Sequence, residues 1–232
     1  MLQKVMKDLK GDAIVARDGE IGSVRDVYFD DQRWAVRYLV VDTGKWLPGR
    51  KVLISPASVT GADERSLRVA LSREQVQNAP DPGEDPPVSR LMEEAHAKHY
   101  GYPPYWTGPY LWGATDVPLA EHPAEYGEKQ SRAREEAQEQ AAQRARETHL
   151  RSSSEVVGYR IQAADGEIGH VEDFLVDDRS WAIADMVVDT GNWLPGRKVR
   201  VAPSAIEDID WNGRQVRVRL TRAEIERSAE LH

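Results

Sequence analysis

Two stretches of sequence decide the fold of this chain: residues 40–52 read VVDTGKWLPGRKV, and residues 187–199 read VVDTGNWLPGRKV. They differ at one position, where Lys45 in the first stretch corresponds to Asn192 in the second. In both, an apolar run rich in valine enters a turn at Asp-Thr-Gly, a Trp-Leu-Pro-Gly loop follows, and Arg-Lys-Val begins a second apolar run. This pattern predicts two β-strands joined by a structured loop. Because it occurs twice, we expect two copies of one small β-rich unit.

The sequence around each stretch is repeated as well. The shared segments are Asp-Gly-Glu-Ile-Gly at 18–22 and 165–169, and Asp-Asp at 30–31 and 177–178, followed by Trp34 and Trp181. Asp-Gly favours a tight hairpin turn, and a glycine inside the next strand, at Gly22, favours a bulge. The expected strands of the first copy lie at 13–16, 21–29, 34–41, 50–54 and 66–71. Pro56 ends the fourth, and Ser72-Arg73-Glu74-Gln75 is typical of a helix capping box.

The predicted domain organisation is a first β unit at 1–79, a linker at 80–155 and a second β unit at 156–232. The linker begins with proline and acidic residues, which favour extended structure. Ser89 is expected to cap a short helix, and the aromatic segment 100–112 follows. Residues 124–150, rich in Glu, Gln, Ala and Arg, predict a second helix with only an alanine stripe to bury.

Composition limits the classes of function. The net charge of -8 argues against general affinity for DNA and makes RNA binding less favourable. The mean hydropathy is -0.62 and no apolar run is long enough for a membrane span or a secretory signal. The chain has no cysteine, which excludes disulfides and thiol chemistry. A soluble cytoplasmic protein is the simplest interpretation.

Taken together, the Asp-Gly-Glu-Ile-Gly opening, the Asp-Asp-x-x-Trp turn and the Asp-Thr-Gly-x-Trp-Leu-Pro-Gly-Arg-Lys-Val signature resemble the PRC-barrel family. This family joins the cytoplasmic domain of the photosynthetic reaction centre H subunit and the C-terminal domain of the bacterial ribosome maturation factor. The resemblance covers both repeats, and the Pro-Pro-Tyr-Trp segment at 103–106 is similar to the linker of tandem PRC-barrel proteins.

The resemblance implies a mainly β fold made of two small antiparallel β-barrels, joined by an aromatic and helical linker. It also implies action through protein–protein contact, because no catalytic residue set belongs to this fold. The chain lacks the transmembrane helix of the H subunit and the N-terminal domain of the maturation factor, so neither specific role transfers directly. We expect a non-enzymatic interaction or scaffold module that forms a homodimer, because a lone β unit of this size is marginally stable. Contact with a photosynthetic or membrane-associated complex is one version of this expectation.

Two other classes of function stay open at this point. One is an RNA- or ribosome-associated adaptor, and the other is a metal-binding protein or an enzyme. For the second class, Glu93, His96 and His99 could share one helix face, although a lone Glu-x-x-His lacks further ligands. The Asp pairs at 30–31 and 177–178 could bind a cation, but Asp is also a common turn residue. No nucleophile triad or phosphate-binding glycine loop is present, and no cofactor is expected.

The candidate interaction residues fall into two groups. The first group lies in the repeated loops: Trp46, Leu47, Arg50 and Lys51, and Trp193, Leu194, Arg197 and Lys198. Each Trp could anchor a partner or cover the end of its own unit, and the Arg-Lys pairs could face Asp42 and Asp189. The second group is Tyr105, Trp106 and Trp112. These aromatics could dock in a partner's groove or fill a seam between the two repeats, and we favour the seam.

Overall fold

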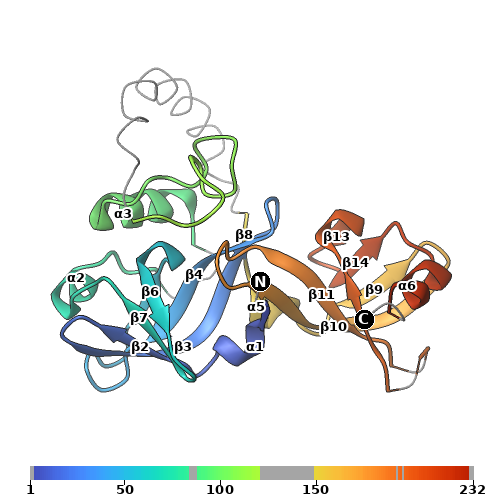
Figure 1. Cartoon of the computed structure of the whole chain (residues 1–232), viewed down its shortest axis with the longest axis horizontal. Coiled ribbons are helices and arrows are strands. Elements are labelled where there is room, and N and C mark those ends of the chain that lie inside the picture. Colours follow the sequence, from blue (N-terminus) through green and yellow to red (C-terminus); the bar gives the residue numbers. More distant parts are fainter. Residues whose placement is uncertain (1–2, 84–87, 121–148, 192, 195, 230–232) are drawn as a thin grey trace. The chain divides into compact units, whose positions relative to one another are not determined.

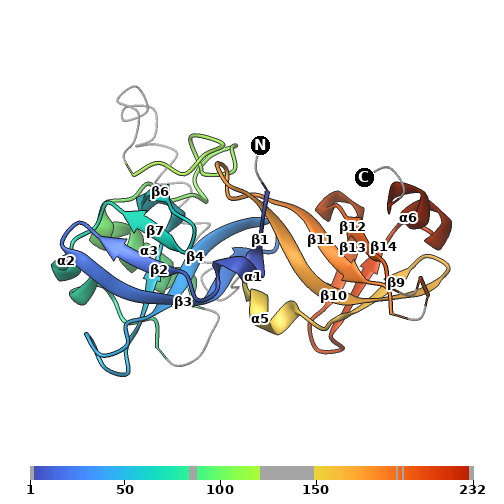
Figure 2. The same ribbon diagram turned by 60° about the horizontal axis from the view of Figure 1, so that its bottom comes forward.

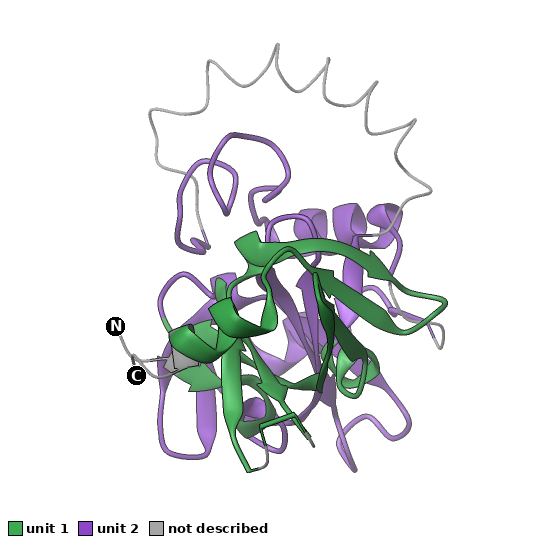
Figure 3. Ribbon diagram, turned by 90° about the vertical axis from the view of Figure 1, so that its right-hand side faces the viewer, with its two compact units in different colours: residues 1–8, 153–178, 182–232 green, residues 9–152, 179–181 purple. Residues whose placement is uncertain are grey.

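The computed structural model describes residues 3–83, 88–120, 149–191, 193–194 and 196–229. Its contacts divide the chain into two compact units, coloured in Figure 3. Unit 2 contains residues 9–152 and 179–181, and therefore the first repeat and the described linker. Unit 1 contains residues 1–8, 153–178 and 182–232, and therefore most of the second repeat.

Unit 2 is built on a seven-stranded sheet (Figure 1). Its strands are β2 (Ala13–Ala16), β3 (Gly19–Asp30), β4 (Ala35–Asp42), β5 (Lys51–Ile54), β6 (Val59–Ala62), β7 (Ser66–Val69) and β8 (Leu150–Ser152). The order is β5-β4-β3-β2-β7-β6, with β8 paired to β3. The two end strands, β5 and β6, are consecutive in the chain and are joined through the 3-10 turn η1 (Pro56–Ser58). The mainly β prediction is confirmed.

Unit 1 repeats this sheet. Its strands are β1 (Gln3–Val5), β9 (Arg160–Ala163), β10 (Gly166–Asp177), β11 (Ile183–Asp189), β12 (Lys198–Val201), β13 (Ile206–Asp210) and β14 (Gln215–Val218). The order is β12-β11-β10-β9-β14-β13, with β1 paired to β10, and η3 (Pro203–Ala205) stands where η1 does. In each sheet one pair is parallel, β2 with β7 and β9 with β14. The expectation of wholly antiparallel sheets is corrected in this respect.

Local turn chemistry forms the strands much as the sequence predicts. Strands β2 and β3 meet in a hairpin whose last pair is Ala16 opposite Gly19, and their register shifts between Ile14 and Val15, beside Gly22. This is the predicted bulge. Trp34, however, is not the first residue of β4. It lies in the turn before the strand with φ at 52°, because the Asp30 carboxylate accepts hydrogen bonds from the next turn's backbone and fixes its shape.

Short helices close both repeats through capping boxes. Helix α2 (Arg73–Gln77) begins at Ser72, whose side chain accepts from the backbone of Gln75 while the Gln75 side chain accepts from the backbone of Ser72. Thr221 and Glu224 make the same exchange at the start of α6 (Arg222–Ala229). In both cases the predicted cap is confirmed.

Each unit also includes a short arm that precedes the other repeat in the sequence. Strand β1 and helix α1 (Met6–Leu9) come before the first repeat, yet β1 pairs with β10 of unit 1. Strand β8 comes before the second repeat, yet it pairs with β3 of unit 2, and helix α5 (Ser153–Val156), which follows it directly, belongs to unit 1. Figure 2 labels α1, α5 and β1. The sequence interpretation did not anticipate this reciprocal exchange.

The described linker packs on unit 2. Helix α3 (Arg90–Tyr100), capped by Ser89 as predicted, covers one face of the sheet. Its underside meets an apolar cluster made of Tyr28, Tyr38, Val40, Leu53, Val88 and Leu150. In the repeat alignment, Tyr38 and Leu53 correspond to Asp185 and Arg200 of unit 1. At these two positions the matching face of unit 1 is polar, while Tyr28 and Val40 correspond to the apolar Leu175 and Val187.

Two parts of the linker and first repeat differ from the predictions. Strand β6 was not predicted, because Val-Thr-Gly-Ala lacks strong β propensity and its side chains are half-buried or exposed. Most of the helix predicted at 124–150 lies outside the described residues. Its last residue, Leu150, is the first residue of strand β8.

Candidate functional site

The repeated loop of unit 2 is held in shape by its own polar groups. The carboxylate of Asp42 accepts a hydrogen bond from the backbone of Gly44 at 2.8 Å. The buried Thr43 hydroxyl donates between the carbonyl oxygens of Leu47 and Arg50, at 2.6 and 2.8 Å. A backbone bond from Trp46 to the Thr43 carbonyl closes the turn at 3.2 Å. The Asp-Thr-Gly residues therefore fix the loop conformation, called here the loop frame, that presents the Trp46 side chain.

The loop of unit 1 has the same frame. Asp189 accepts from Gly191 at 2.8 Å, and the Thr190 hydroxyl lies 2.7 Å from the carbonyl oxygens of both Leu194 and Arg197. The backbone of Trp193 donates to Thr190 at 3.0 Å. Asn192 and Pro195 lie outside the described residues, so the comparison rests on the rest of the loop. Two copies of one loop geometry are thus present in the chain.

A glycine in the neighbouring strand lets each loop pack closely against its sheet. A Cβ on Gly22 would lie 2.0 Å from the carbonyl oxygen of Asp42, and a Cβ on Gly169 would lie 1.9 Å from that of Asp189. No side chain fits at these distances. The two repeated motifs, Glu-Ile-Gly and Asp-Thr-Gly, are therefore parts of one site in each unit.

An arginine that the sequence interpretation missed supports each Trp ring. The guanidinium carbon of Arg73 lies 4.5 Å from the ring centroid of Trp46, within cation–π distance, and that of Arg222 lies 6.0 Å from Trp193. The backbone of each arginine donates to the hairpin aspartate, Asp18 or Asp165, at 2.8 Å. The signal was present in the sequence, since Ser-Arg and Thr-Arg occupy matching positions at the two capping boxes.

Beside each loop is an open hollow. In unit 2 it measures about 420 Å³, and its lining includes Glu20, Gly22, Asp42, Lys45 and Trp46. In unit 1 it measures about 660 Å³, and its lining includes Arg160, Glu167, His170, Trp193 and Arg222. Both Trp side chains are half-buried, as are Leu47 and Leu194. One part of each Trp ring therefore packs against its own unit, and the other part is accessible at the hollow.

The Arg-Lys pairs after the loops do not act alike. Arg50 donates to the carbonyl oxygens of Gln77, at 2.5 Å, and Ala79, so it fixes the chain that follows α2. Lys198 pairs with Glu172 at 2.5 Å rather than with Asp189, its neighbour across the strands. Lys51 and Arg197 are exposed. Of these four side chains, Lys51 and Arg197 are therefore the ones left accessible to a partner.

The aromatic segment packs within unit 2. Tyr105 and Trp112 are buried, and Trp106 is half-buried. Between them lies Arg37, which is 1% exposed and has its guanidinium carbon 3.8 Å from the Tyr105 ring and 4.7 Å from the Trp112 ring. Arg37 also donates to Asp30, at 3.2 Å, and to the Leu111 carbonyl, at 2.9 Å. Tyr105 and Trp112 are thus interior residues, and the predicted seam between the repeats stays a prediction.

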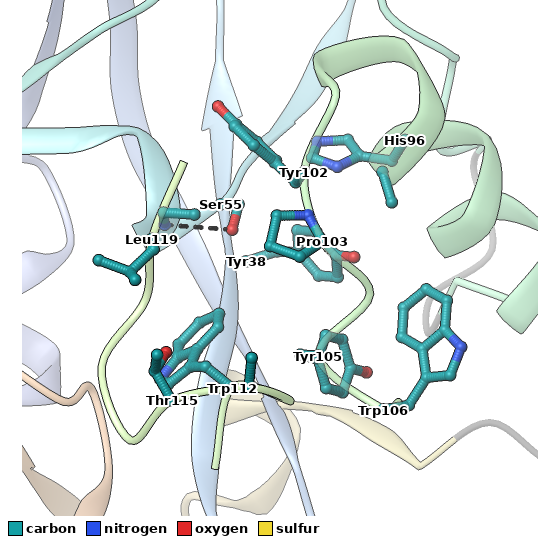
Figure 4. Close-up of a pocket in the computed structure, with 13 residues that line it drawn as sticks. Tyr38, Ser55, His96, Tyr102, Pro103, Tyr105, Trp106, Trp112, Thr115 and Leu119 are labelled. Carbon is teal, nitrogen blue, oxygen red and sulfur yellow. Dashed lines mark hydrogen bonds between the residues drawn. The ribbon is translucent and has the colours of Figure 1, made fainter. Parts of the chain in front are cut away.

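Helix α3 contributes two buried ionisable groups below this segment. Glu93 accepts from Arg90 at 2.8 Å and from the Tyr105 hydroxyl at 2.5 Å, and burial raises its pKa to about 7. His96 bonds the Leu53 carbonyl at 2.9 Å, and burial lowers its pKa to about 4. A neighbouring cavity of about 30 Å³, shown in Figure 4, has room for a water molecule but not for a substrate.

The metal hypotheses receive no support from these contacts. Glu93, His96 and His99 face different partners, and His99 bonds the Gln75 carbonyl at 2.8 Å. Asp30 binds turn backbone and Arg37, while Asp31 pairs with Arg151 at 2.8 Å. Among the described residues, no three His, Cys, Asp or Glu side chains are grouped as metal ligands would be.

Comparison with known families identifies the first repeat. Residues 6–71 match the family model of the PRC-barrel domain. This segment is a PRC-barrel domain. The match runs from arm α1 through strand β7, so it includes the Trp46 loop and its hollow. The search of curated proteins found no match to this chain. In the described part of the chain, no helix is long and apolar enough to cross a bilayer.

Proposed function

We propose that this chain is a non-enzymatic interaction module with two PRC-barrel domains, which binds protein partners through its two Trp loops. The second repeat is included because it carries the same strand order and the same loop frame as the matched segment. The observation that carries the proposal is the duplicated loop, in which a rigid frame holds a half-buried Trp beside an open hollow.

A loop of this kind suits binding for a physical reason. Affinity at protein interfaces is concentrated in a few large aromatic and arginine side chains. Binding also costs less when those side chains are already held in place, because less conformational entropy is lost. The Thr43 and Thr190 hydrogen bonds and the close approach at Gly22 and Gly169 supply this preorganisation.

A more specific form of the proposal is that the partner belongs to a photosynthetic or membrane-associated complex. Its support is the resemblance to the reaction centre H subunit. Self-association as a homodimer is a second specific form, supported by the small size of the β units, since such domains gain stability by burying more surface. Light scattering on the purified full chain tests this form directly, with twice the chain mass expected.

The proposal is tested by capturing partners of the tagged full chain, expressed at native level and crosslinked in cells. Trp46→Ala combined with Trp193→Ala should remove the proteins that the wild type enriches. Leu91→Ala is the matched control, because it removes an apolar side chain that is 65% exposed on α3 and lines neither Trp hollow. The proposal fails if the wild type enriches nothing, or if the double variant captures the same proteins as the wild type.

A further inference from the structure

The two Trp hollows share a frame but differ in the basic side chains that line them. The hollow in unit 2 is lined by two carboxylates, from Glu20 and Asp42, and by one cation, from Lys45. The hollow in unit 1 is lined by two guanidinium groups and an imidazole, against the single carboxylate of Glu167. Since the frames are equal, this difference is not required by the fold.

The two loops share the acidic pairs Glu20 with Glu167 and Asp42 with Asp189, so the difference lies in where the other cations stand. Unit 2 has Lys45 where unit 1 has Asn192, and unit 1 has Arg160 and His170 where unit 2 has Ala13 and Ser23. Arg160 in β9 lies directly opposite His170 in β10, and the equivalent pair in unit 2 is Ala13 opposite Ser23. Directly opposed residues project from the same face of a sheet, and cationic neighbours there disfavour folding when both are charged. The first repeat shows that small neutral residues can occupy this pair. The shared fold therefore does not require the basic pair in unit 1.

These side chains are also available to a ligand. Arg160 and His170 are exposed, and their side chains make no hydrogen bond or ion pair with residues that the structure describes. Arg222 is partly committed, because it donates to the Glu167 carbonyl at 2.5 Å. Trp193 lines the same hollow and offers apolar surface next to the cations.

We propose that the hollow of unit 1 binds an acidic peptide segment of a partner protein, with carboxylates on Arg160 and His170 and an apolar side chain on Trp193. Arginine suits this role because its planar group binds carboxylates through two hydrogen bonds. A volume of about 660 Å³ admits a few residues of such a segment. Protein is favoured over RNA because affinity for a phosphate backbone requires many basic contacts along an extended face, whereas this hollow offers a few basic groups beside the apolar surface of Trp193.

This inference rests on the proposed function and names the partner chemistry of one loop. The test uses the full chain and a variant that gives unit 1 the residues of unit 2, Arg160→Ala with His170→Ser. A reciprocal variant, Ala13→Arg with Ser23→His, places the basic pair in unit 2. Both variants use residues that the equivalent strand pair already carries, which limits the risk of misfolding.

The probes are three fluorescein-labelled molecules: a blocked peptide of three Glu-Glu-Leu repeats, the same peptide with Gln for Glu, and a twelve-nucleotide oligouridine. Fluorescence anisotropy at low and high salt measures their binding. We expect the wild type to bind the Glu peptide at least tenfold more tightly than the Gln peptide, and to lose most of this preference at high salt. The Arg160→Ala/His170→Ser variant should lose the preference, and the reciprocal variant should increase it.

Equal binding of the Glu and Gln peptides, including no binding of either, would overturn the inference, and so would tighter binding of oligouridine. A further outcome separates it from the proposed function. If Trp46→Ala/Trp193→Ala loses the cellular partners but Arg160→Ala/His170→Ser keeps them, the acidic-peptide inference is wrong and the Trp-loop proposal stands. If the wild type prefers the Glu peptide but enriches no protein, the peptide site stands and the broader proposal fails.

Discussion

The buried carboxylate of Asp173 in β10 accepts the backbone N–H of Lys7, whose nitrogen lies 3.2 and 3.3 Å from its two oxygens. Asp173 lies at a register shift between β10 and β11, and Lys7 belongs to the arm that precedes the first repeat. The equivalent residue in β3, Asp26, accepts from the Ser152 hydroxyl at 2.5 Å, in the arm that precedes the second repeat. A carboxylate at a register shift, buried for Asp173 and half-buried for Asp26, therefore contacts the exchanged arm in each unit.

Replacing Asp173 with Ala should destabilise the protein by about 1–3 kcal/mol, because the buried backbone N–H of Phe174, 2.7 Å from the carboxylate, and the part-buried N–H of Lys7 both lose their acceptor. Chemical denaturation followed by circular dichroism measures the change. Asp178→Ala is the matched control, since it removes the same charge from an exposed position in the next turn and should stay within about 0.5 kcal/mol of wild type. Equal effects of the two substitutions would show that the carboxylate does not hold the arm.

The pKa values of Glu93 and His96 predict pH effects of opposite sign. The folded-state pKa of Glu93, about 7, lies above its usual 4.5, so its contribution to stability is present at low pH and is lost as pH rises from 4.5 to 7. The folded-state pKa of His96, about 4, lies below its usual 6.5, so its contribution is present above pH 6.5 and is lost as pH falls to 4. Between pH 4.5 and 6.5 the two slopes oppose each other.

Glu93→Gln should therefore expose the His96 slope, with stability relative to wild type rising by up to about 3 kcal/mol from pH 4.5 to 7. His96→Gln should do the reverse, with relative stability falling over pH 4 to 6.5. Denaturation midpoints across pH 4–8 measure both. Parallel pH profiles for wild type and the two variants would contradict the assigned burial of these groups.

The loop frame predicts that Thr43→Val lowers stability by about 1–2 kcal/mol, because two loop carbonyls lose the hydroxyl while the side-chain volume is kept. Amide hydrogen exchange should become faster at Trp46, whose N–H bonds the Thr43 carbonyl. Thr60→Val is the control, because the Thr60 hydroxyl donates at an exposed site, 3.2 Å from the Arg68 carbonyl. Unchanged exchange at Trp46 in Thr43→Val would mean that the hydroxyl does not set the loop.

Features of the fold that depend on neighbouring residues could be predicted from the sequence. The Asp-Gly hairpin, the bulge beside Gly22 and the capping boxes at Ser72 and Thr221 depend on residues close in the chain, and the structure has each of them. The repeat itself identified both loops and the PRC-barrel domain. Turn chemistry and internal repetition thus carried most of the fold.

Features that depend on distant partners could not be predicted. The arms at 3–9 and 150–156 are too short to show a period, and nothing in their residues names the strand that receives them. The parallel pairings of β2 with β7 and β9 with β14 depend on which strand the chain comes to lie beside. The alternation of apolar and polar residues does not encode this. Arg73 and Arg222 required knowledge that the helix start lies beside the Trp ring.

The most direct test of the Trp-loop account is the affinity of the full chain for the partner it captures, measured for wild type, Trp46→Ala, Trp193→Ala and the double variant. The account predicts at least a tenfold loss for one or both single variants and a larger loss for the double variant, with unchanged circular dichroism. Affinities within twofold of wild type for all three variants would contradict it.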